Sequence, residues 1–152
     1  MIRFTETDGE RCELKGIVIV THGRLSEYLL ESSSMFVTNT AAVQPISFVP
    51  GQGVEDLITS LREALDQLGA VDGVLALVDL PGGSPARAVG TIFSEGKTHV
   101  PLEVVSGVNL PMLVEVLMLR DSMELSELAD YAVEAGNGGI VNVGKVLRGG
   151  DF

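Results

Sequence analysis

The chain has 152 residues, of which 45% are hydrophobic and 20% charged, as is typical of one globular domain with a full-sized core. Its formal net charge of −11 excludes a broad nucleic-acid or anionic-membrane surface, because either surface needs a basic face. The single cysteine, Cys12, and the lack of any apolar stretch long enough to span a bilayer favour a cytoplasmic setting without disulfides.

Short apolar runs alternate with helical patterns along the chain, which predicts βαβ units around a parallel sheet. Five runs have the character of strands, the last more weakly than the others: 16–21, 43–49, 73–78, 102–106 and 140–143. The first run is short, rich in β-branched residues and without alternation, as expected for a strand buried on both faces. The expected fold class is therefore α/β, a doubly wound and mostly parallel sheet with helices on both faces.

His22 follows the first predicted strand directly and precedes a helical pattern. In open α/β sheets, ligands and catalytic groups collect at the carboxyl ends of the strands, so His22 is a candidate reactive group. A buried structural histidine or a plain loop residue is the alternative interpretation.

Three segments after the second strand predict helices. Residues 53–68 carry leucines and Ile58 at helical spacing and form a core-facing stripe. Residues 110–119 are apolar nearly all round, and Arg120 follows at the end where the helix dipole favours a cation. Residues 124–135 are expected as an outer helix that ends at Gly136.

The turn from Asp79 to Pro85, after the third strand, is the second candidate site. Gly82 and Gly83 can take backbone angles closed to other residues, Pro85 suits the first helical position, and Ser84 is the expected N-cap. Such a turn presents free amides at a helix N-terminus, which attract phosphate or another oxyanion. A tight turn with a purely structural cap is the alternative.

A third strand-to-helix transition at residues 106–112 would line the same rim of the sheet. The strands before His22 and Asp79 are expected neighbours, so these two side chains can meet. A carboxylate bonded to one imidazole nitrogen leaves the lone pair of the other nitrogen free to attack. These residues require no metal and no organic cofactor, and the other histidine, His99, is expected in a surface loop without metal-ligand spacing.

Four segments, in this order and spacing, resemble the enzyme IIA domain of the mannose-type branch of the bacterial phosphoenolpyruvate-dependent sugar phosphotransferase system. They are residues 16–23 (GIVIVTHG), 48–51 (FVPG), 78–85 (VDLPGGSP) and 107–112 (GVNLPM). The resemblance implies a phosphotransferase of sugar uptake, in which His22 accepts a phosphoryl group from the histidine phosphocarrier protein and passes it to a IIB subunit. Asp79 would orient the imidazole, while Gly82, Gly83 and Ser84 would bind the phosphoryl group.

The resemblance also implies a homodimer, in which the last strand can pair into the sheet of the partner, and an indirect link to membrane permease subunits. It places a single IIA domain at residues 16–146, an N-terminal arm or extra edge segment at 1–15, and a tail at 147–152. After the turn, Ala86-Arg87-Ala88-Val89 departs from the Phe-Asn-Ala common in the family. A cation in a first helical turn is disfavoured by the dipole, so Arg87 either lies in solvent or meets an acidic group of a partner or the phosphoryl group.

Two other functions remain open. Ser84, His22 and Asp79 could form a hydrolase triad, although the Gly-x-Ser-x-Gly pattern of the α/β-hydrolases is absent. A regulatory module that is phosphorylated without a role in transport would use the same histidine.

Overall fold

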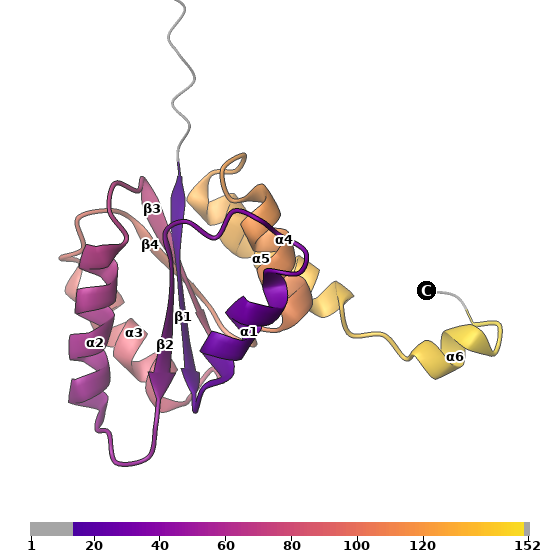
Figure 1. The fold of residues 1–152 in the computed structure, drawn as a ribbon, viewed down its shortest axis with the longest axis horizontal. Coiled ribbons are helices and arrows are strands. Elements are labelled where there is room, and N and C mark those ends of the chain that lie inside the picture. Colours follow the sequence, from indigo (N-terminus) through magenta and orange to yellow (C-terminus); the bar gives the residue numbers. More distant parts are fainter. Residues whose placement is uncertain (1–13, 151–152) are drawn as a thin grey trace, which may run out of the picture.

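The computed structural model describes residues 14–150 and contains four strands and six helices in that range (Figure 1). In chain order these are β1 (Lys15–His22), α1 (Leu25–Ser33), β2 (Val43–Phe48), α2 (Val54–Gln67), β3 (Gly73–Val78), α3 (Ser84–Glu95), β4 (Leu102–Val105), α4 (Leu110–Leu119), α5 (Leu125–Gly138) and α6 (Val143–Leu147). The four stronger strand predictions are confirmed, with ends that differ by up to one residue. None of the described helices is long and apolar enough to cross a bilayer.

The strands form one parallel sheet in the order β2-β1-β3-β4, which confirms the predicted α/β class. From β1 the chain turns toward β2, and from β3 it turns the other way toward β4. The connections that leave these two central strands therefore diverge, and open α/β sheets bind their ligands at such a point, beyond the carboxyl ends of the strands. The fold places this switch point directly after Val20 and Val78, which are paired in register.

The core has two halves, one on each face of the sheet. Ile17 and Ile19 of β1 face the half made with α4 and α5, whereas Val18 and Val20 face the half made with α2 and α3. Figure 1 shows α2 and α3 on one side of the sheet and α1, α4 and α5 on the other. The side chains of these four β1 residues are fully buried. Burial of each one stabilises the fold by about 1.5–3 kcal/mol relative to leaving it exposed. Burial on both faces explains why this strand lacks the alternation of a half-exposed one.

Helix α5 does not end where the sequence suggested. Gly136 lies inside the helix and is buried, and a Cβ built there would come within 2.7 Å of Met112 Cε. The glycine therefore permits the close approach of α5 to α4 and is not a C-cap, so the prediction that Gly136 ends the helix is wrong. Packing between helices, which sequence periodicity does not reveal, determines the residue at this position.

The predicted strand at residues 140–143 is also wrong. Residues 140–142 have no regular structure, and α6 begins at Val143. Ile140 is 76% exposed, and the segment extends away from the sheet (Figure 1). A strand needs a neighbouring backbone for its hydrogen bonds, and this segment pairs with none of the four described strands. Of the predicted N-terminal arm, residues 1–15, the first 13 residues lie outside the part of the chain that the structure describes.

Candidate active site

His22 and Asp79 lie together at the carboxyl ends of β1 and β3. These two strands are adjacent in the sheet, as predicted. The Asp79 carboxylate makes two hydrogen bonds with His22. Its Oδ2 atom accepts one from the His22 backbone N–H at 2.8 Å and makes the other with ring Nδ1 at 2.9 Å. The other oxygen, Oδ1, accepts from the Leu80 backbone N–H at 2.8 Å. The His22 side chain is 42% exposed and that of Asp79 is 12% exposed. One carboxylate therefore fixes both the backbone and the ring of an accessible histidine.

These hydrogen bonds determine the protonation of the pair. Burial alone would raise the pKa of Asp79, but the bonds from the His22 backbone, the His22 ring and the Leu80 backbone outweigh it and leave the pKa below its ordinary value. Asp79 is therefore a carboxylate near neutral pH and can only accept hydrogen bonds. Ring Nδ1 must then carry the proton, and in the neutral ring the lone pair is on Nε2.

Gly83 brings the N-terminus of α3 against the His22 ring. A Cβ at Gly83 would lie 2.5 Å from His22 Cε1 and 3.2 Å from Nε2, so only glycine allows this approach. Gly83 is the N-cap, and α3 starts at Ser84 with Pro85 in its first turn. The expected N-cap was Ser84, one residue later. Within residues 14–150, the backbone N–H groups of Ser84 and Ala86 donate no hydrogen bond, so they remain available to an anion beside Nε2.

Phe48, at the end of β2, forms a second wall of the site. Its ring packs edge-on against the His22 ring, with centroids 5.9 Å apart and planes at 74°. Its carbonyl accepts a 2.7 Å hydrogen bond from the Gly23 N–H, and its side chain also packs on the core half formed with α2 and α3. The Phe48 side chain therefore contributes both to the wall of the site and to the core.

The third strand-to-helix transition supports the site from behind. The Gly107 N–H donates to the Asp79 carbonyl at 2.9 Å, and the Val108 N–H donates to the Val78 carbonyl at 3.0 Å. Asn109 caps α4 by accepting from the Met112 N–H at 3.0 Å. These contacts fix the backbone that carries Asp79, while no hydrogen bond joins Asn109 to His22 among the described residues.

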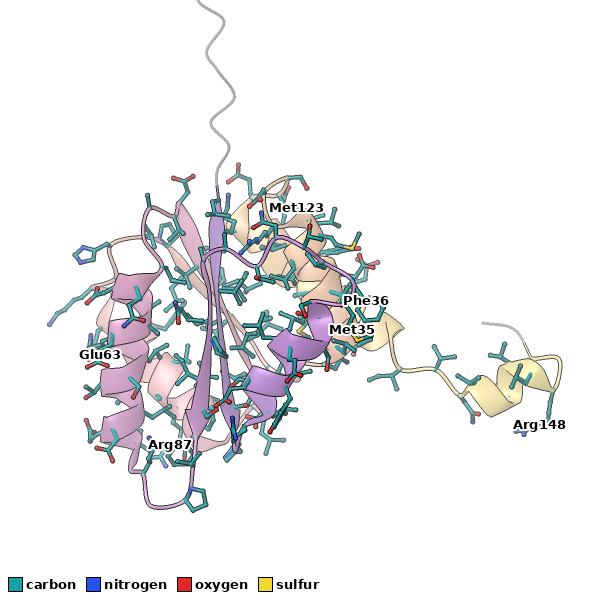
Figure 2. All side chains as sticks on the ribbon, viewed as in Figure 1. Met35, Phe36, Glu63, Arg87, Met123 and Arg148 are labelled. Carbon is teal, nitrogen blue, oxygen red and sulfur yellow. The ribbon has the colours of Figure 1, made fainter. Side chains whose placement is uncertain are left out.

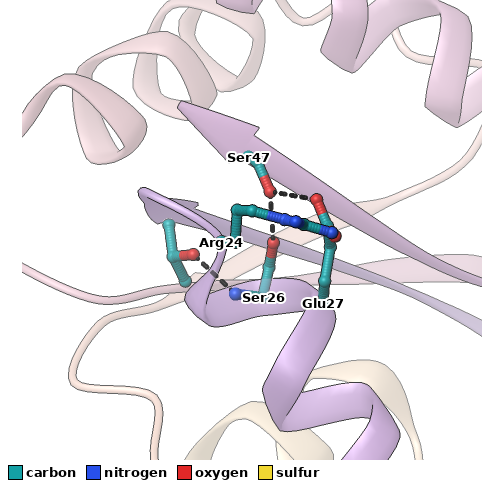
Figure 3. A network of polar contacts seen from close by, with 5 residues as sticks. Arg24, Ser26, Glu27 and Ser47 are labelled. Atoms are coloured by element: carbon teal, nitrogen blue, oxygen red, sulfur yellow. Dashed lines mark hydrogen bonds and ion pairs between the residues drawn. The ribbon is translucent and has the colours of Figure 1, made fainter. Parts of the chain in front are cut away.

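A polar network beside His22 was missed by sequence reasoning (Figure 3). The Arg24 guanidinium donates two hydrogen bonds to Glu27 Oε2, at 3.0 and 2.7 Å, and Ser47 Oγ donates to Glu27 Oε1 at 2.8 Å. The network ties the start of α1 to β2. The spacing of Arg24 and Glu27, three residues apart, suggests such a pair, but the contribution of Ser47 depends on the register of β2.

The remaining candidates lie as follows. Ser84 Oγ makes no hydrogen bond to His22, so the pair of residues needed to activate a serine nucleophile is not formed. Arg87 is exposed. His99 is exposed in the loop before β4, at the end of the sheet opposite His22. Among the described residues, no group of three or more His, Cys, Asp or Glu side chains could hold a metal ion.

Comparisons with known proteins identify the family of the chain. Residues 16–133 match the model of the family EIIA-man, described as "PTS system fructose IIA component". The chain is 45% identical over 125 residues to the PTS system mannose-specific EIIAB component of Escherichia coli K12, covering 82% of this chain and 38% of that protein. It is 33% identical over 112 residues to the PTS system fructose-specific EIIA component of Bacillus subtilis, covering 74% of this chain and 75% of that protein.

A solved structure also matches most of the chain. The phosphotransferase system component EIIA from Streptococcus agalactiae superposes with a TM-score of 0.78 at 27% identity, covering 87% of this chain and 99% of that chain. The chain spans only 38% of the length of the E. coli EIIAB relative.

Proposed function

This chain belongs to the EIIA-man family of phosphotransferase system (PTS) components, and from that membership we propose that it relays phosphoryl groups in sugar uptake through transient phosphorylation of His22. The observation that carries the proposal is the hydrogen bond between Asp79 and His22. This bond keeps the ring proton on Nδ1 and leaves Nε2 free beside the N-terminus of α3. Components of this family are phosphotransferases.

The proposed transfer needs no proton movement at His22. The lone pair of His22 Nε2 attacks the phosphorus of a phosphohistidine on the donor protein, so a new N–P bond forms as the donor N–P bond breaks. The donor imidazole, protonated on its other nitrogen, leaves with the electron pair of the broken bond and becomes neutral. The His22 ring keeps its proton on Nδ1 and becomes a phosphorylated cation, whose charge the Asp79 carboxylate stabilises.

The turn before α3 is the proposed phosphoryl-binding element. Phosphoryl transfer depends mainly on in-line positioning and on stabilising charge on the phosphoryl oxygens. Gly83 lies against the ring, and the N–H groups of Ser84 and Ala86 have no acceptor among residues 14–150. We assign Gly82, Gly83 and Ser84 to this role, with the helix dipole adding to the attraction.

The proposed partners are proteins. The donor is the histidine phosphocarrier protein and the acceptor is a IIB subunit, with membrane permease subunits reached indirectly. At 42% exposure, the His22 ring is accessible to a phosphohistidine presented on the convex surface of another protein.

A homodimer completes the proposal. The segment after α5 carries exposed apolar side chains, among them Ile140 at 76% and Leu147 at 81% exposed. A hollow of about 540 Å³ lies beside the start of this segment and is lined by Phe36, Pro111 and Tyr131 among others, and Figure 2 shows Phe36 on the side from which the segment leaves. A second copy would cover these surfaces. Sedimentation should then give a dimer for the full chain and a monomer for a chain that ends at Gly139.

The test of the relay is intact mass after incubation with phosphoenolpyruvate, enzyme I and the phosphocarrier protein. We expect one acid-labile phosphate on the protein and none on His22→Ala, and loss of that phosphate when a IIB subunit is added. Phosphate retained on His22→Ala would place the site elsewhere. Phosphate on His22 that no IIB subunit accepts would instead indicate the regulatory module.

A further inference from the structure

Arg87 lies near the N-terminus of α3, the end of the helix that meets His22. Its backbone N–H donates a 3.0 Å hydrogen bond to the carbonyl of Gly83, so Arg87 is one turn further along the helix. Gly83 itself lies against the ring, because a Cβ built on it would come within 2.5 Å of His22 Cε1. Figure 2 shows Arg87 at the end of the molecule where β1 and β2 terminate. Arg87 is therefore one helical turn from the residue that lies against the His22 ring.

The side chain of Arg87 can extend back toward the His22 ring. Side chains on a helix point back toward its N-terminus and cover the preceding turn. For Arg87 that turn begins at Gly83, which touches the His22 ring. A guanidinium is planar, permanently charged and suited to paired hydrogen bonds with phosphate oxygens.

Arg87 is also uncommitted, unlike the other cation near His22. The Arg24 guanidinium donates two hydrogen bonds to Glu27 (Figure 3). It also lies 5.5 Å from the centroid of the Tyr28 ring. Arg87 is exposed, and its side chain makes no hydrogen bond or ion pair within residues 14–150. Of these two arginines, only Arg87 is free to meet an anion without first breaking an ion pair.

The charge of Arg87 interacts with the dipole of α3 and would also interact with a phosphoryl group on His22. A cation in the first turns of a helix opposes the positive end of the helix dipole, which costs a few tenths of a kcal/mol or more. A phosphoryl group on Nε2 would lie between the α3 amides and the guanidinium, and its negative charge would reverse the sign of that interaction. The cost of Arg87 in the unphosphorylated protein would then favour phosphorylation.

We propose that Arg87 binds the oxygens of the phosphoryl group on His22, both during transfer and in the phosphorylated protein. This assignment rests on the proposed phosphorylation of His22 and adds a residue to that site. No covalent bond changes at Arg87, which only donates hydrogen bonds. The family pattern common at this turn has no arginine here, so the contact would be a property of this chain.

The test compares Arg87→Gln with Lys97→Gln, which also removes one exposed positive charge but from the loop at the opposite end of α3. With the phosphocarrier protein as donor, we expect Arg87→Gln to lower kcat at least about 10-fold with little change in KM, as for loss of one oxyanion donor. Arg87→Lys should restore part of kcat, and Lys97→Gln should behave as wild type.

A spectroscopic measurement separates contact with the phosphoryl group from contact with the donor protein. The guanidinium Nε–H signal of Arg87, identified as the signal lost in Arg87→Gln, should shift when His22 is phosphorylated and the donor has been removed. A raised KM with unchanged kcat, together with an unmoved Arg87 signal in the phosphorylated protein, would overturn the inference and leave the phosphorylation of His22 intact. Absence of phosphate on His22 itself would instead refute the proposed function.

Discussion

The Asp79 Oδ2 atom accepts hydrogen bonds from two groups of the same residue, the backbone N–H and the ring Nδ1–H of His22, at 2.8 and 2.9 Å. One carboxylate oxygen thus joins the end of β1 to the residue that follows β3. The position of the ring, its tautomer and the alignment of the two strand ends all depend on this atom.

Replacement of Asp79 by Asn should slow phosphorylation of His22 without unfolding the protein. The amide has one acceptor oxygen in place of two, so it cannot serve the His22 and Leu80 N–H groups and also fix the tautomer. We expect the initial rate of phosphorylation to fall on the order of 100-fold or more. Asp66→Asn, which removes an exposed carboxylate near the opposite end of the sheet, should keep the wild-type rate. Equal rates for the two variants would show that Asp79 does not control the ring.

The same carboxylate should make stability depend on pH. The pKa of Asp79 is lower in the folded protein than its usual value, about 3.9 in an unfolded chain. Its contribution to the free energy of unfolding is therefore fully present above the unfolded pKa and is lost as pH falls through the folded pKa. Urea unfolding should show Asp79→Asn less stable than wild type at about pH 7 and a smaller difference at about pH 3.5. A difference that grows toward acid pH would mean that the folded pKa is raised.

Gly83→Ala should disturb the ring and leave the backbone unstrained. Gly83 has φ −78°, which any residue adopts, but the added methyl would lie 2.5 Å from His22 Cε1. The ring must move, and a shift on the order of 1 Å can cost about 100-fold in rate. Gly90→Ala, inside α3, is the matched control, because a Cβ there meets nothing within 4 Å. The account requires slow phosphorylation of Gly83→Ala, near-normal phosphorylation of Gly90→Ala and no loss of Tm in either variant.

Arg120 should contribute to stability from a buried position. It is 0% exposed, and it donates hydrogen bonds to the carbonyls of Lys15 at 3.2 Å and Asn39 at 3.4 Å. Burial lowers the pKa of Arg120, although the Asp121 carboxylate opposes this effect. Arg120→Ala would leave a cavity and two carbonyls without these donors, at a cost of about 2–5 kcal/mol in denaturant unfolding.

The control for Arg120 is Arg62→Ala. Arg62 is 48% exposed and paired with Glu95 at 2.6 Å, and such a surface pair is worth about 0–1 kcal/mol. If the two variants lost equal stability, the buried hydrogen bonds of Arg120 would have no structural role.

The central features of the fold could be predicted because they depend on local pattern and chain order. The run at residues 16–21 has the character of a doubly buried strand, and the order of βαβ units makes β1 and β3 neighbours, which brings His22 to Asp79. The carboxyl ends of these strands then lie on one rim whatever the details of packing. The candidate residues could be grouped for the same reason.

Features that depend on packing could not be predicted. Arg120 follows a helix at the end where the dipole favours a cation, but its burial and its hydrogen bonds to two carbonyls from distant segments depend on tertiary packing. Gly136 has the character of a helix stop, yet it permits contact with Met112. The Ser47 hydroxyl reaches Glu27 only in the observed register of β2. Residues 140–143 have strand-like side chains but no strand of the described sheet beside them.

The most direct test of the central claim is to identify the ring nitrogen that carries the phosphoryl group. Protein labelled with ¹⁵N in its histidines, phosphorylated through the phosphocarrier protein, would be studied by NMR for a one-bond coupling between phosphorus and nitrogen. The account predicts coupling to Nε2 of His22, with Nδ1 still protonated and bonded to Asp79. Coupling to Nδ1 of His22, or to His99, would contradict it.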